Sequence, residues 1–133
     1  MNYKSLARLA VSAKTNAYAP FSDFHVGAAL LTRDGKIYTG CNVESSSYSL
    51  TICAERNAVF KAYSEGERSF KAIAIAGDLP GFCSPCGACR QVLSDLCGNI
   101  DVVLINGSDE IAEYKLADLL PMAFGMENLK DNK

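Results

Sequence analysis

The sequence predicts an α/β protein with three layers, α/β/α, built around a mixed five-stranded sheet. Five apolar segments of strand length lie along the chain, and segments with helical periodicity separate most of them. The first two are joined by a tight turn and the later ones alternate with helices, which indicates a mixed sheet with helices on both faces. With 133 residues and 49% hydrophobic side chains, the chain fits a single domain over 1–133.

The first half of the chain is predicted to contain a helix, a hairpin and a second helix. The expected ranges are a helix over 3–18, strands over 26–32 and 37–42, and a helix over 51–66. The buried face of the first helix is expected to carry Leu6, Leu9, Ala10 and Ala13. Pro20 follows the end of this helix, Asp34-Gly35 marks the hairpin turn, and Thr51 is the expected cap of the second helix.

The second half alternates strands and helices. Strands are expected over 72–76, 101–106 and 111–114, and helices over 86–97 and 116–120. Pro85 precedes the first of these helices, Gly98-Asn99 ends it, and Pro121 stops the second. The strand over 72–76 is apolar at every position, so we expect it to be buried on both faces.

The composition excludes several classes of protein. A net charge of −2 and a pI near 5.3 provide no excess of basic side chains, so we expect no nucleic acid partner. No apolar run approaches the roughly 18 residues of a membrane-spanning helix, and residues 1–8 lack the apolar core of a signal peptide. The expected location is therefore the cytoplasm, without membrane contact, and the expected partner is a small molecule.

Six cysteines are the main chemical feature of the chain. In a reducing compartment, clustered cysteines indicate a metal site or catalysis and not a disulfide framework. Cys86 and Cys89 are three residues apart at the start of a predicted helix, so their sulfurs face the same side. Cys53 adds a third sulfur from the start of the preceding helix. This spacing favours one tetrahedral Zn²⁺ held by three cysteines, with no obvious fourth protein ligand.

An open coordination position distinguishes a catalytic zinc site from a structural one, which has four protein ligands. Glu55 lies two residues after Cys53 and is the candidate proton carrier for a zinc-activated water. Three thiolates give the site a net negative charge, which we expect Arg56 and the two helix N-termini to compensate. Considered alone, Glu55 is also typical of a carboxylate that interacts with a helix N-terminus.

The other cysteines and the single histidine have structural interpretations. Cys41 and Cys97 are expected in the core. Cys83, three residues before Cys86, is either an additional thiol or a fourth ligand that would close the zinc site. His25 is expected to make structural hydrogen bonds.

Two motifs resemble the zinc signature of the cytidine deaminases, Cys53-Ala54-Glu55 and Pro85-Cys86-Gly87-Ala88-Cys89-Arg90-Gln91. They are most similar to the small homotetrameric branch of that family, whose zinc ligands are all cysteines. The resemblance includes the segments 18–30, 40–44 and 119–124, and so covers most of the chain. It implies a cytidine deaminase-like fold, one Zn²⁺ per subunit, and hydrolytic deamination of cytidine and deoxycytidine to the uridines with release of ammonia, as in pyrimidine salvage.

The resemblance also implies roles for individual residues, with Glu55 as the catalytic proton carrier. Phe24 would stack on the pyrimidine, and Asn42 and Glu44 would hydrogen-bond the ribose 3′-hydroxyl. The backbone carbonyl of Ala54 would accept from the exocyclic amine. Two further residues would close the site of a neighbouring subunit in a homotetramer with sites at subunit interfaces, Tyr48 and Phe124.

Two alternative functions stay open at this level. The zinc motifs are shared with deaminases of other cytosine nucleosides, such as antibiotics of the blasticidin type, although the sugar- and base-binding residues favour cytidine. The second alternative is a non-catalytic zinc module in which Cys83 completes a four-cysteine site.

Overall fold

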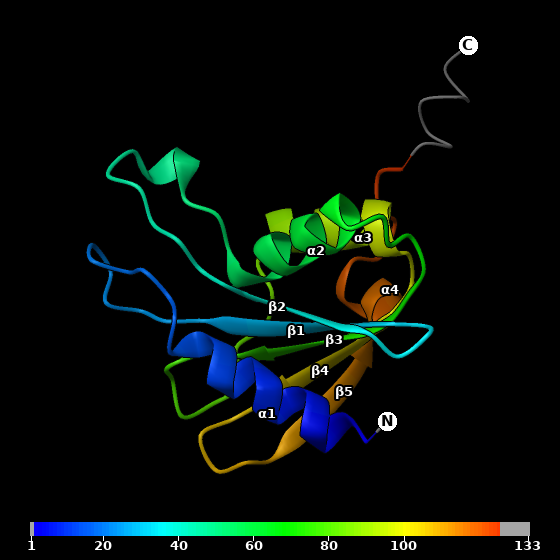
Figure 1. Ribbon diagram of the computed structural model, residues 1–133, viewed down its shortest axis with the longest axis horizontal. Coiled ribbons are helices and arrows are strands. Elements are labelled where there is room, and N and C mark those ends of the chain that lie inside the picture. Colours follow the sequence, from blue (N-terminus) through cyan, green and yellow to red (C-terminus); the bar gives the residue numbers. More distant parts are fainter. Residues whose placement is uncertain (1, 126–133) are drawn as a thin grey trace.

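The computed structural model describes residues 2–125. Within this range, five strands and five helices, one of them a short 3-10 helix, follow one another as drawn in Figure 1. Their bounds are α1 (Tyr3–Lys14), β1 (Gly27–Thr32), β2 (Ile37–Cys41), η1 (Tyr48–Leu50), α2 (Ala54–Ser64), β3 (Phe70–Ala76), α3 (Gly87–Cys97), β4 (Asp101–Ile105), β5 (Ile111–Lys115) and α4 (Leu116–Leu119).

The strands form one mixed sheet in the order β2-β1-β3-β4-β5. β3 and β4 are parallel, and each of the other neighbouring pairs is antiparallel. Helix α1 covers one face of the sheet, and α2 and α3 cover the other (Figure 1). The predicted α/β/α fold with a mixed five-stranded sheet is therefore confirmed. None of the helices described has the length and apolarity that a bilayer-spanning segment requires.

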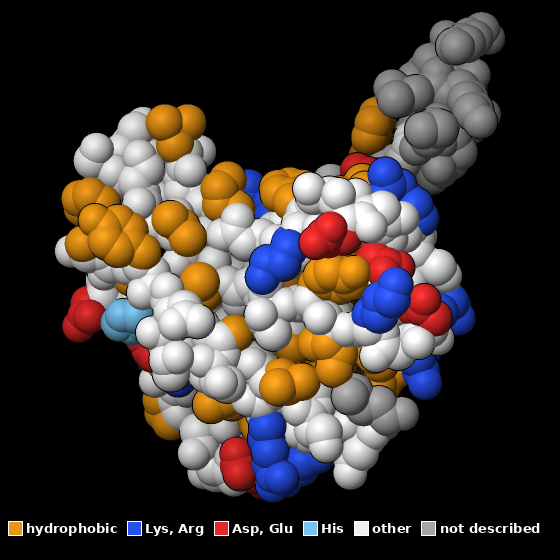
Figure 2. All heavy atoms as spheres, in the orientation of Figure 1, with side chains coloured by type: hydrophobic (Ala, Val, Ile, Leu, Met, Phe, Trp, Pro, Cys, Tyr) orange, Lys and Arg blue, Asp and Glu red, His pale blue; other side chains and the backbone are white. Residues whose placement is uncertain are grey.

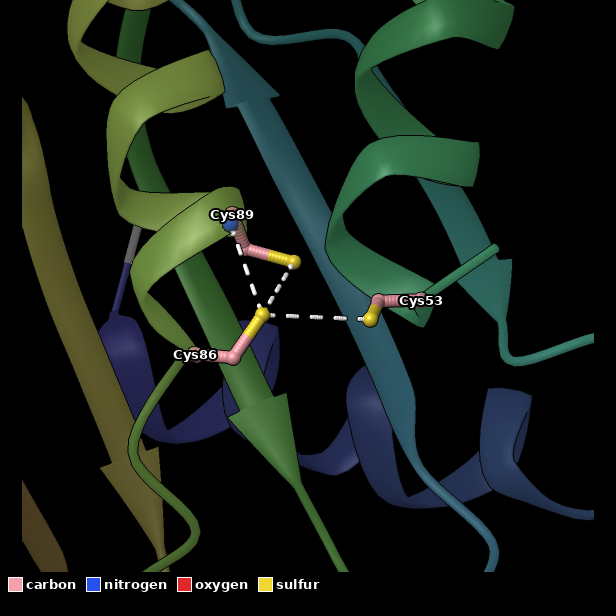
Figure 3. A group of neighbouring side chains, drawn as sticks. All are labelled: Cys53, Cys86 and Cys89. Carbon is pink, nitrogen blue, oxygen red and sulfur yellow. Dashed lines mark hydrogen bonds between the residues drawn. The ribbon is translucent and has the colours of Figure 1, made fainter. Parts of the chain in front are cut away.

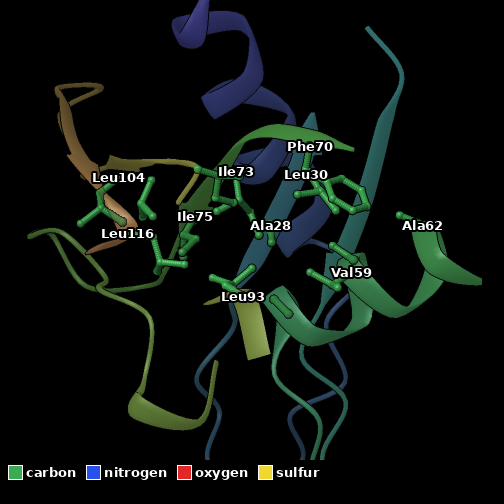
Figure 4. Close-up of a cluster of buried hydrophobic side chains, with 14 residues drawn as sticks. Ala28, Leu30, Val59, Ala62, Phe70, Ile73, Ile75, Leu93, Leu104 and Leu116 are labelled. Carbon is green, nitrogen blue, oxygen red and sulfur yellow. The ribbon is translucent and has the colours of Figure 1, made fainter. Parts of the chain in front are cut away.

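The hydrophobic core has two parts, one on each face of the sheet, and the alternation of residues along β3 separates them. Ile73 and Ile75 pack with Leu30, Val59 and Leu93 on the face that α2 and α3 cover (Figure 4). The face toward α1 carries the small residues of the same strand, Ala72, Ala74 and Ala76. The strand is buried on both faces over 72–76, as predicted, with its larger side chains toward α2 and α3 and its alanines toward α1.

Helix α1 is shorter than the sequence predicted. The chain after Lys14 leaves the helix, and Tyr18 forms an isolated parallel bridge with Val43. Of the predicted buried face, Leu6 and Ala10 are fully buried, but Leu9 is 38% exposed and Ala13 is half-buried, while Ala7 is fully buried without having been predicted. A helical pattern alone does not reveal which of the apolar residues at the border of a helix face a sheet will cover.

Helix α2 has Cys53 at its N-cap, and not Thr51 as predicted. The hydroxyl of Thr51 is engaged elsewhere, since it accepts a hydrogen bond from the backbone N–H of Ser45 at 3.1 Å. The extended backbone of Cys53, with φ −72° and ψ 158°, turns its side chain out from the open end of the helix. The other predicted boundaries differ from the observed ones by one or two residues.

Gly40 sets the distance between β2 and α2. A Cβ atom at this position would lie 2.4 Å from the carbonyl oxygen of Ala54 and 2.5 Å from the backbone nitrogen of Ala58, both in α2. We expect Gly40→Ala to push α2 away from the sheet and to lower the free energy of unfolding by about 3 kcal/mol. Chemical denaturation measures this loss. Gly81→Ala is the control, because a Cβ there meets nothing within 4 Å, and equal stabilities of the two variants would contradict the expectation.

Candidate metal centre

Three cysteine sulfurs converge where the N-termini of α2 and α3 lie side by side (Figure 3). The Sγ atom of Cys86 lies 4.0 Å from that of Cys53 and 3.4 Å from that of Cys89. All three sulfurs lie within 4.8 Å of one another, and within residues 2–125 they form the group that can hold a metal ion. The structure thus brings together the three predicted zinc ligands.

Each sulfur is placed by the start of a helix. Cys53 and Cys86 are N-cap residues with extended backbone, so their side chains project from the open ends of α2 and α3. Cys89 lies in the first turn of α3, where its backbone N–H donates to the sulfur of Cys86 at 3.4 Å. The spacing of three residues therefore puts both sulfurs on one side of the helix start.

The geometry of the three sulfurs fits zinc. Zn–S bonds of about 2.3 Å in a tetrahedral site place two sulfurs about 3.8 Å apart. The measured separations of 3.4 and 4.0 Å bracket that distance. Two helix N-termini add partial positive charge, which favours thiolate over thiol. Three cysteines leave one tetrahedral position for a ligand from outside the protein.

Arg56 and the sulfurs themselves determine the electrostatics of the site. The hydrogen bond from the thiol of Cys89 and, to a smaller extent, the contact with Arg56 together lower the pKa of Cys53 to about 5, against the effect of burial. The same contact with Cys53 raises the pKa of Cys89, and burial adds to this effect. The Nη2 atom of Arg56 lies 3.3 Å from the Cys53 sulfur. Arg56 thus stabilises negative charge on one of the three ligands, in the place that the sequence predicted.

We expect Arg56→Ala to weaken zinc binding by about 10- to 100-fold, the usual effect of removing a hydrogen-bond partner of a metal ligand. The cause would be the loss of the charge-assisted contact to Cys53. Competition with a chromophoric chelator measures the affinity, and Arg33→Ala, which removes an exposed cation from the hairpin turn, is the control. Equal zinc affinities for wild type and Arg56→Ala would contradict this role.

Glu55 lies close to the sulfurs and is almost fully buried, with 4% of its surface exposed. It lines a cavity of about 190 Å³ together with Cys53 and Cys86. Burial raises the pKa of Glu55 to about 7. A carboxyl group with such a pKa can both accept and donate a proton near neutral pH.

The residues predicted to bind substrate are divided between two adjoining hollows. Asn42 and Ala54 line the cavity beside the sulfurs. Glu44 and Tyr48 line a more open hollow of about 410 Å³, and Thr51 lines both. Among the described residues, two predicted substrate contacts line neither hollow, Phe24 and Phe124.

Asn42 and Glu44 hold the chain segment that carries Phe24. The side chain of Asn42 accepts from the N–H of Val26 and donates to the carbonyl of Phe24, both at 2.8 Å. The Glu44 carboxylate accepts from the backbone N–H groups of residues 21–22 at 2.9 and 3.1 Å. Both side chains therefore shape the site as well as line it.

The two aromatic residues predicted to reach a neighbouring subunit are exposed. Tyr48 is 74% exposed and Phe124 is 57% exposed. The carbonyl of Phe124 accepts from the side chain of Gln91 at 2.6 Å, which keeps this segment beside α3. Figure 2 shows hydrophobic side chains gathered over the loops that follow α1 and β2. Exposed residues of these loops include Phe21 and Leu50.

Arg90 has a structural role that sequence reasoning missed. Its guanidinium donates to the carbonyl of Pro85 at 2.8 Å, to the hydroxyl of Ser84 at 2.7 Å and to the carbonyl of Leu119 at 3.0 Å. These bonds fix the loop that delivers Cys86 and tie it to α4. The position of Arg90 directly after a metal ligand was the available signal, but the contact with Leu119 is tertiary.

The other three cysteines and the histidine lie outside the group of three sulfurs. Cys83 lines the cavity beside the sulfurs but lies outside the group of three. Cys97 packs against the core, and Cys41 is half-buried at the end of β2. His25 makes a structural contact, with Nδ1 2.7 Å from a carboxylate oxygen of Asp78.

The α/β/α fold, with three cysteine sulfurs and a buried carboxylate at two helix N-termini, defines a metal-dependent enzyme. Residues 1–105 match the family described as "Cytidine and deoxycytidylate deaminase zinc-binding region". The cytidine deaminase of Sporosarcina psychrophila is 52% identical over 97% of this chain and 96% of its own length. That of Halalkalibacterium halodurans is 48% identical over 98% of this chain and 100% of its own.

A solved structure agrees with these relatives. The crystal structure of cytidine deaminase from Burkholderia pseudomallei matches with a TM-score of 0.90 and 48% identity, and the match covers 93% of this chain and 100% of that one. The chain therefore belongs to the cytidine and deoxycytidylate deaminase family, and its metal ion is zinc.

Proposed function

We propose that this chain catalyses the hydrolytic deamination of cytidine and deoxycytidine to uridine and deoxyuridine, with release of ammonia. The observation that carries the proposal is the placement of buried Glu55 in the cavity that Cys53 and Cys86 also line. Hydrolytic deamination needs an activated water and a group that moves protons beside it. The relatives from S. psychrophila and H. halodurans are named cytidine deaminases.

In the proposed reaction, Glu55 is the proton carrier. Cys53, Cys86 and Cys89 would hold the zinc ion, which would supply a water of lowered pKa. Glu55 would carry one proton from the water to N3 of the pyrimidine and a second, from the hydroxyl added at C4, to the departing amine, in the general acid–base role that the glutamate has in zinc deaminases. Because Glu55 lies in the first turn of α2, two residues from Cys53, one helix start fixes its position relative to the metal.

We propose that Ala54 contacts the base through its N–H and not through its carbonyl, the group assigned from the sequence. The carbonyl oxygen lies against β2, since a Cβ on Gly40 would come within 2.4 Å of it. Ala54 is the first residue of α2, so its N–H has no partner within the helix. This donor, at the positive end of the helix dipole, suits the O2 carbonyl of a pyrimidine.

We assign Asn42 and Glu44 to the ribose 3′-hydroxyl and Phe24 to the face of the base. The hollow lined by Glu44 meets the cavity beside the sulfurs at Thr51, which allows a nucleoside to lie across both. A carboxylate has about four acceptor sites, so Glu44 keeps capacity for a sugar hydroxyl while it binds residues 21–22.

We propose a cytoplasmic homotetramer in which subunits complete one another's sites. The cavity of about 190 Å³ beside the sulfurs is smaller than most ligand pockets, which start near 300 Å³. The exposed rings of Tyr48 and Phe124 are available to close a neighbouring site. A reducing cytoplasm keeps thiolate ligands available for zinc. Light scattering tests the assembly, and a fully active monomer would contradict it.

The decisive experiment combines metal analysis with a cytidine assay on the purified protein. We expect one zinc per subunit and a loss of cytidine absorbance that is matched by ammonia release. A zinc-loaded protein that leaves cytidine and deoxycytidine unchanged would overturn the proposal. A blasticidin-type nucleoside assayed in parallel, if turned over faster than cytidine, would favour the alternative substrate class.

A further inference from the structure

The peptide group between Phe24 and His25 is held at both ends by side chains from other parts of the fold. Its carbonyl accepts from the amide of Asn42, at the end of β2, with a distance of 2.8 Å. Its N–H donates to the carboxylate of Asp78, in the loop after β3, with a distance of 2.6 Å. A peptide group is planar and stiff, so anchoring both ends fixes the backbone that orients the Phe24 side chain.

Asp78 makes several contacts with groups around this segment. The same carboxylate oxygen that accepts the His25 N–H also lies 2.7 Å from Nδ1 of the His25 ring. Its other oxygen lies 3.5 Å from Nζ of Lys14, which also donates to the carbonyl of Gly77 at 3.1 Å. Burial opposes ionisation of Asp78, but the hydrogen bonds from His25 and the charge of Lys14 outweigh it and lower the pKa of the carboxyl.

The ring of Phe24 and the side chain of Cys83 both lie against Gly77, next to Asp78. A Cβ built on Gly77 would lie 3.4 Å from Cζ of Phe24 and 2.8 Å from Cβ of Cys83. Phe24 and Cys83 thus approach the same glycine from different loops, and Cys83 lines the cavity beside the sulfurs. Gly77 therefore separates the Phe24 ring from a residue of the cavity wall by the width of one backbone position.

We propose that Asp78 is a positioning residue that holds the Phe24 ring in place for the base of the substrate. The inference rests on the proposed function, because it assigns Phe24 to the base. Without Asp78, only the carbonyl end of the peptide group keeps its side-chain anchor, at Asn42. Stacking on a base contributes in the ground state and in the transition state alike, so its loss raises KM more than it lowers kcat.

The first test compares three variants in the cytidine assay. We expect Asp78→Ala to raise KM about 5-fold with kcat nearly unchanged, the effect of losing one hydrogen-bonded contact. Asp78→Asn keeps an acceptor oxygen for the His25 N–H and should restore most of the affinity. Asp101→Ala is the matched control, because Asp101 is also a bonded carboxylate but lies at the opposite end of the β3–β4 pair. An unchanged KM in Asp78→Ala would overturn the proposal.

A double-mutant cycle separates positioning from a general structural effect. If Asp78 acts through the ring of Phe24, Asp78→Ala should raise KM in the wild type but not in a Phe24→Ala background. Independent effects of the two substitutions on KM would overturn the proposal, because a structural defect would persist without the ring.

A fluorescence reporter tests the same claim without turnover. The chain contains no tryptophan, so Phe24→Trp introduces a single tryptophan, which can be excited at wavelengths that the six tyrosines do not absorb. We expect acrylamide to quench it more strongly when Asp78→Ala is added, and not when Asp101→Ala is added. Equal quenching in Phe24→Trp alone and in its combinations with Asp78→Ala and Asp101→Ala would overturn the role of Asp78. A wild type that fails to deaminate cytidine would instead overturn the proposed function, and the quenching comparison would then decide the role of Asp78 by itself.

Discussion

Replacing Glu55 with Gln is expected to leave zinc bound and to lower kcat by about 10⁴-fold, the upper end of the usual contribution of general acid–base catalysis. The amide has nearly the size of the carboxyl group but cannot take a proton from water or return it to the base. Folding should not suffer, because Glu55 is only 4% exposed and a neutral amide is easier to bury than a carboxylate. Steady-state kinetics and metal analysis on the same preparation check both parts of the prediction.

Glu55→Asp is the matched control for this loss. It keeps a carboxyl group but withdraws it by one methylene, and a misplacement of about 1 Å reduces rates by about 10²-fold. We therefore expect kcat to be highest in the wild type, lower in Glu55→Asp and lowest in Glu55→Gln. Each of the three proteins should bind one zinc per subunit. A Gln variant that retains a tenth or more of the wild-type rate would show that another group carries the proton.

The geometry of the metal centre could be predicted from sequence because local structure determines most of it. Cys86 and Cys89 are related by the rise and turn of one helix start, so their spacing alone brings their sulfurs to 3.4 Å. The approach of Cys53 is a tertiary contact, and it was predicted because a metal needs a third ligand and because the Cys53-Ala54-Glu55 motif is specific. The alternation of strands and helices likewise determined the layers of the fold.

What sequence reasoning missed depends on contacts between distant parts of the chain. Asp78 is 53 positions from His25, and no local pattern relates the two. Thr51 has the residue type of a helix cap, yet its hydroxyl binds Ser45, and a cysteine takes the cap position. In both cases a polar side chain has several possible partners, and the folded backbone decides which one is within reach.

We expect different effects from substituting residues placed by local spacing and residues placed by tertiary contacts. Residues whose positions follow from local spacing, such as Cys86 and Glu55, belong to the chemical centre, and their substitution should affect zinc or kcat. Residues that act through tertiary contacts, such as Asp78 and Asn42, hold the loop over residues 24–26. Their substitution should change substrate affinity while zinc stays bound.

Cys89→Ser is expected to abolish stable zinc binding, with an affinity loss greater than the roughly 100-fold seen when only a partner of a metal ligand is removed. Cys89 is fully buried, and its sulfur lies 3.4 Å from that of Cys86, within the group of three sulfurs that can hold the ion. A serine hydroxyl is neutral at pH 7 and is a poorer zinc ligand than a thiolate. Chelator competition measures the affinity, and circular dichroism of both proteins without metal shows whether the fold is kept.

Cys83→Ala is the control for this loss and also tests the four-cysteine module. Cys83 lines the same cavity as Cys53 and Cys86 but lies outside the group of three sulfurs, so its removal should leave one zinc per subunit and an active enzyme. Four sulfurs would close the tetrahedron and leave no position for water. Release of zinc from Cys83→Ala would therefore mean that a fourth cysteine holds the ion and that the open position required for hydrolysis does not exist. Wild-type zinc affinity in Cys89→Ser would mean that the ion is held by a different set of ligands.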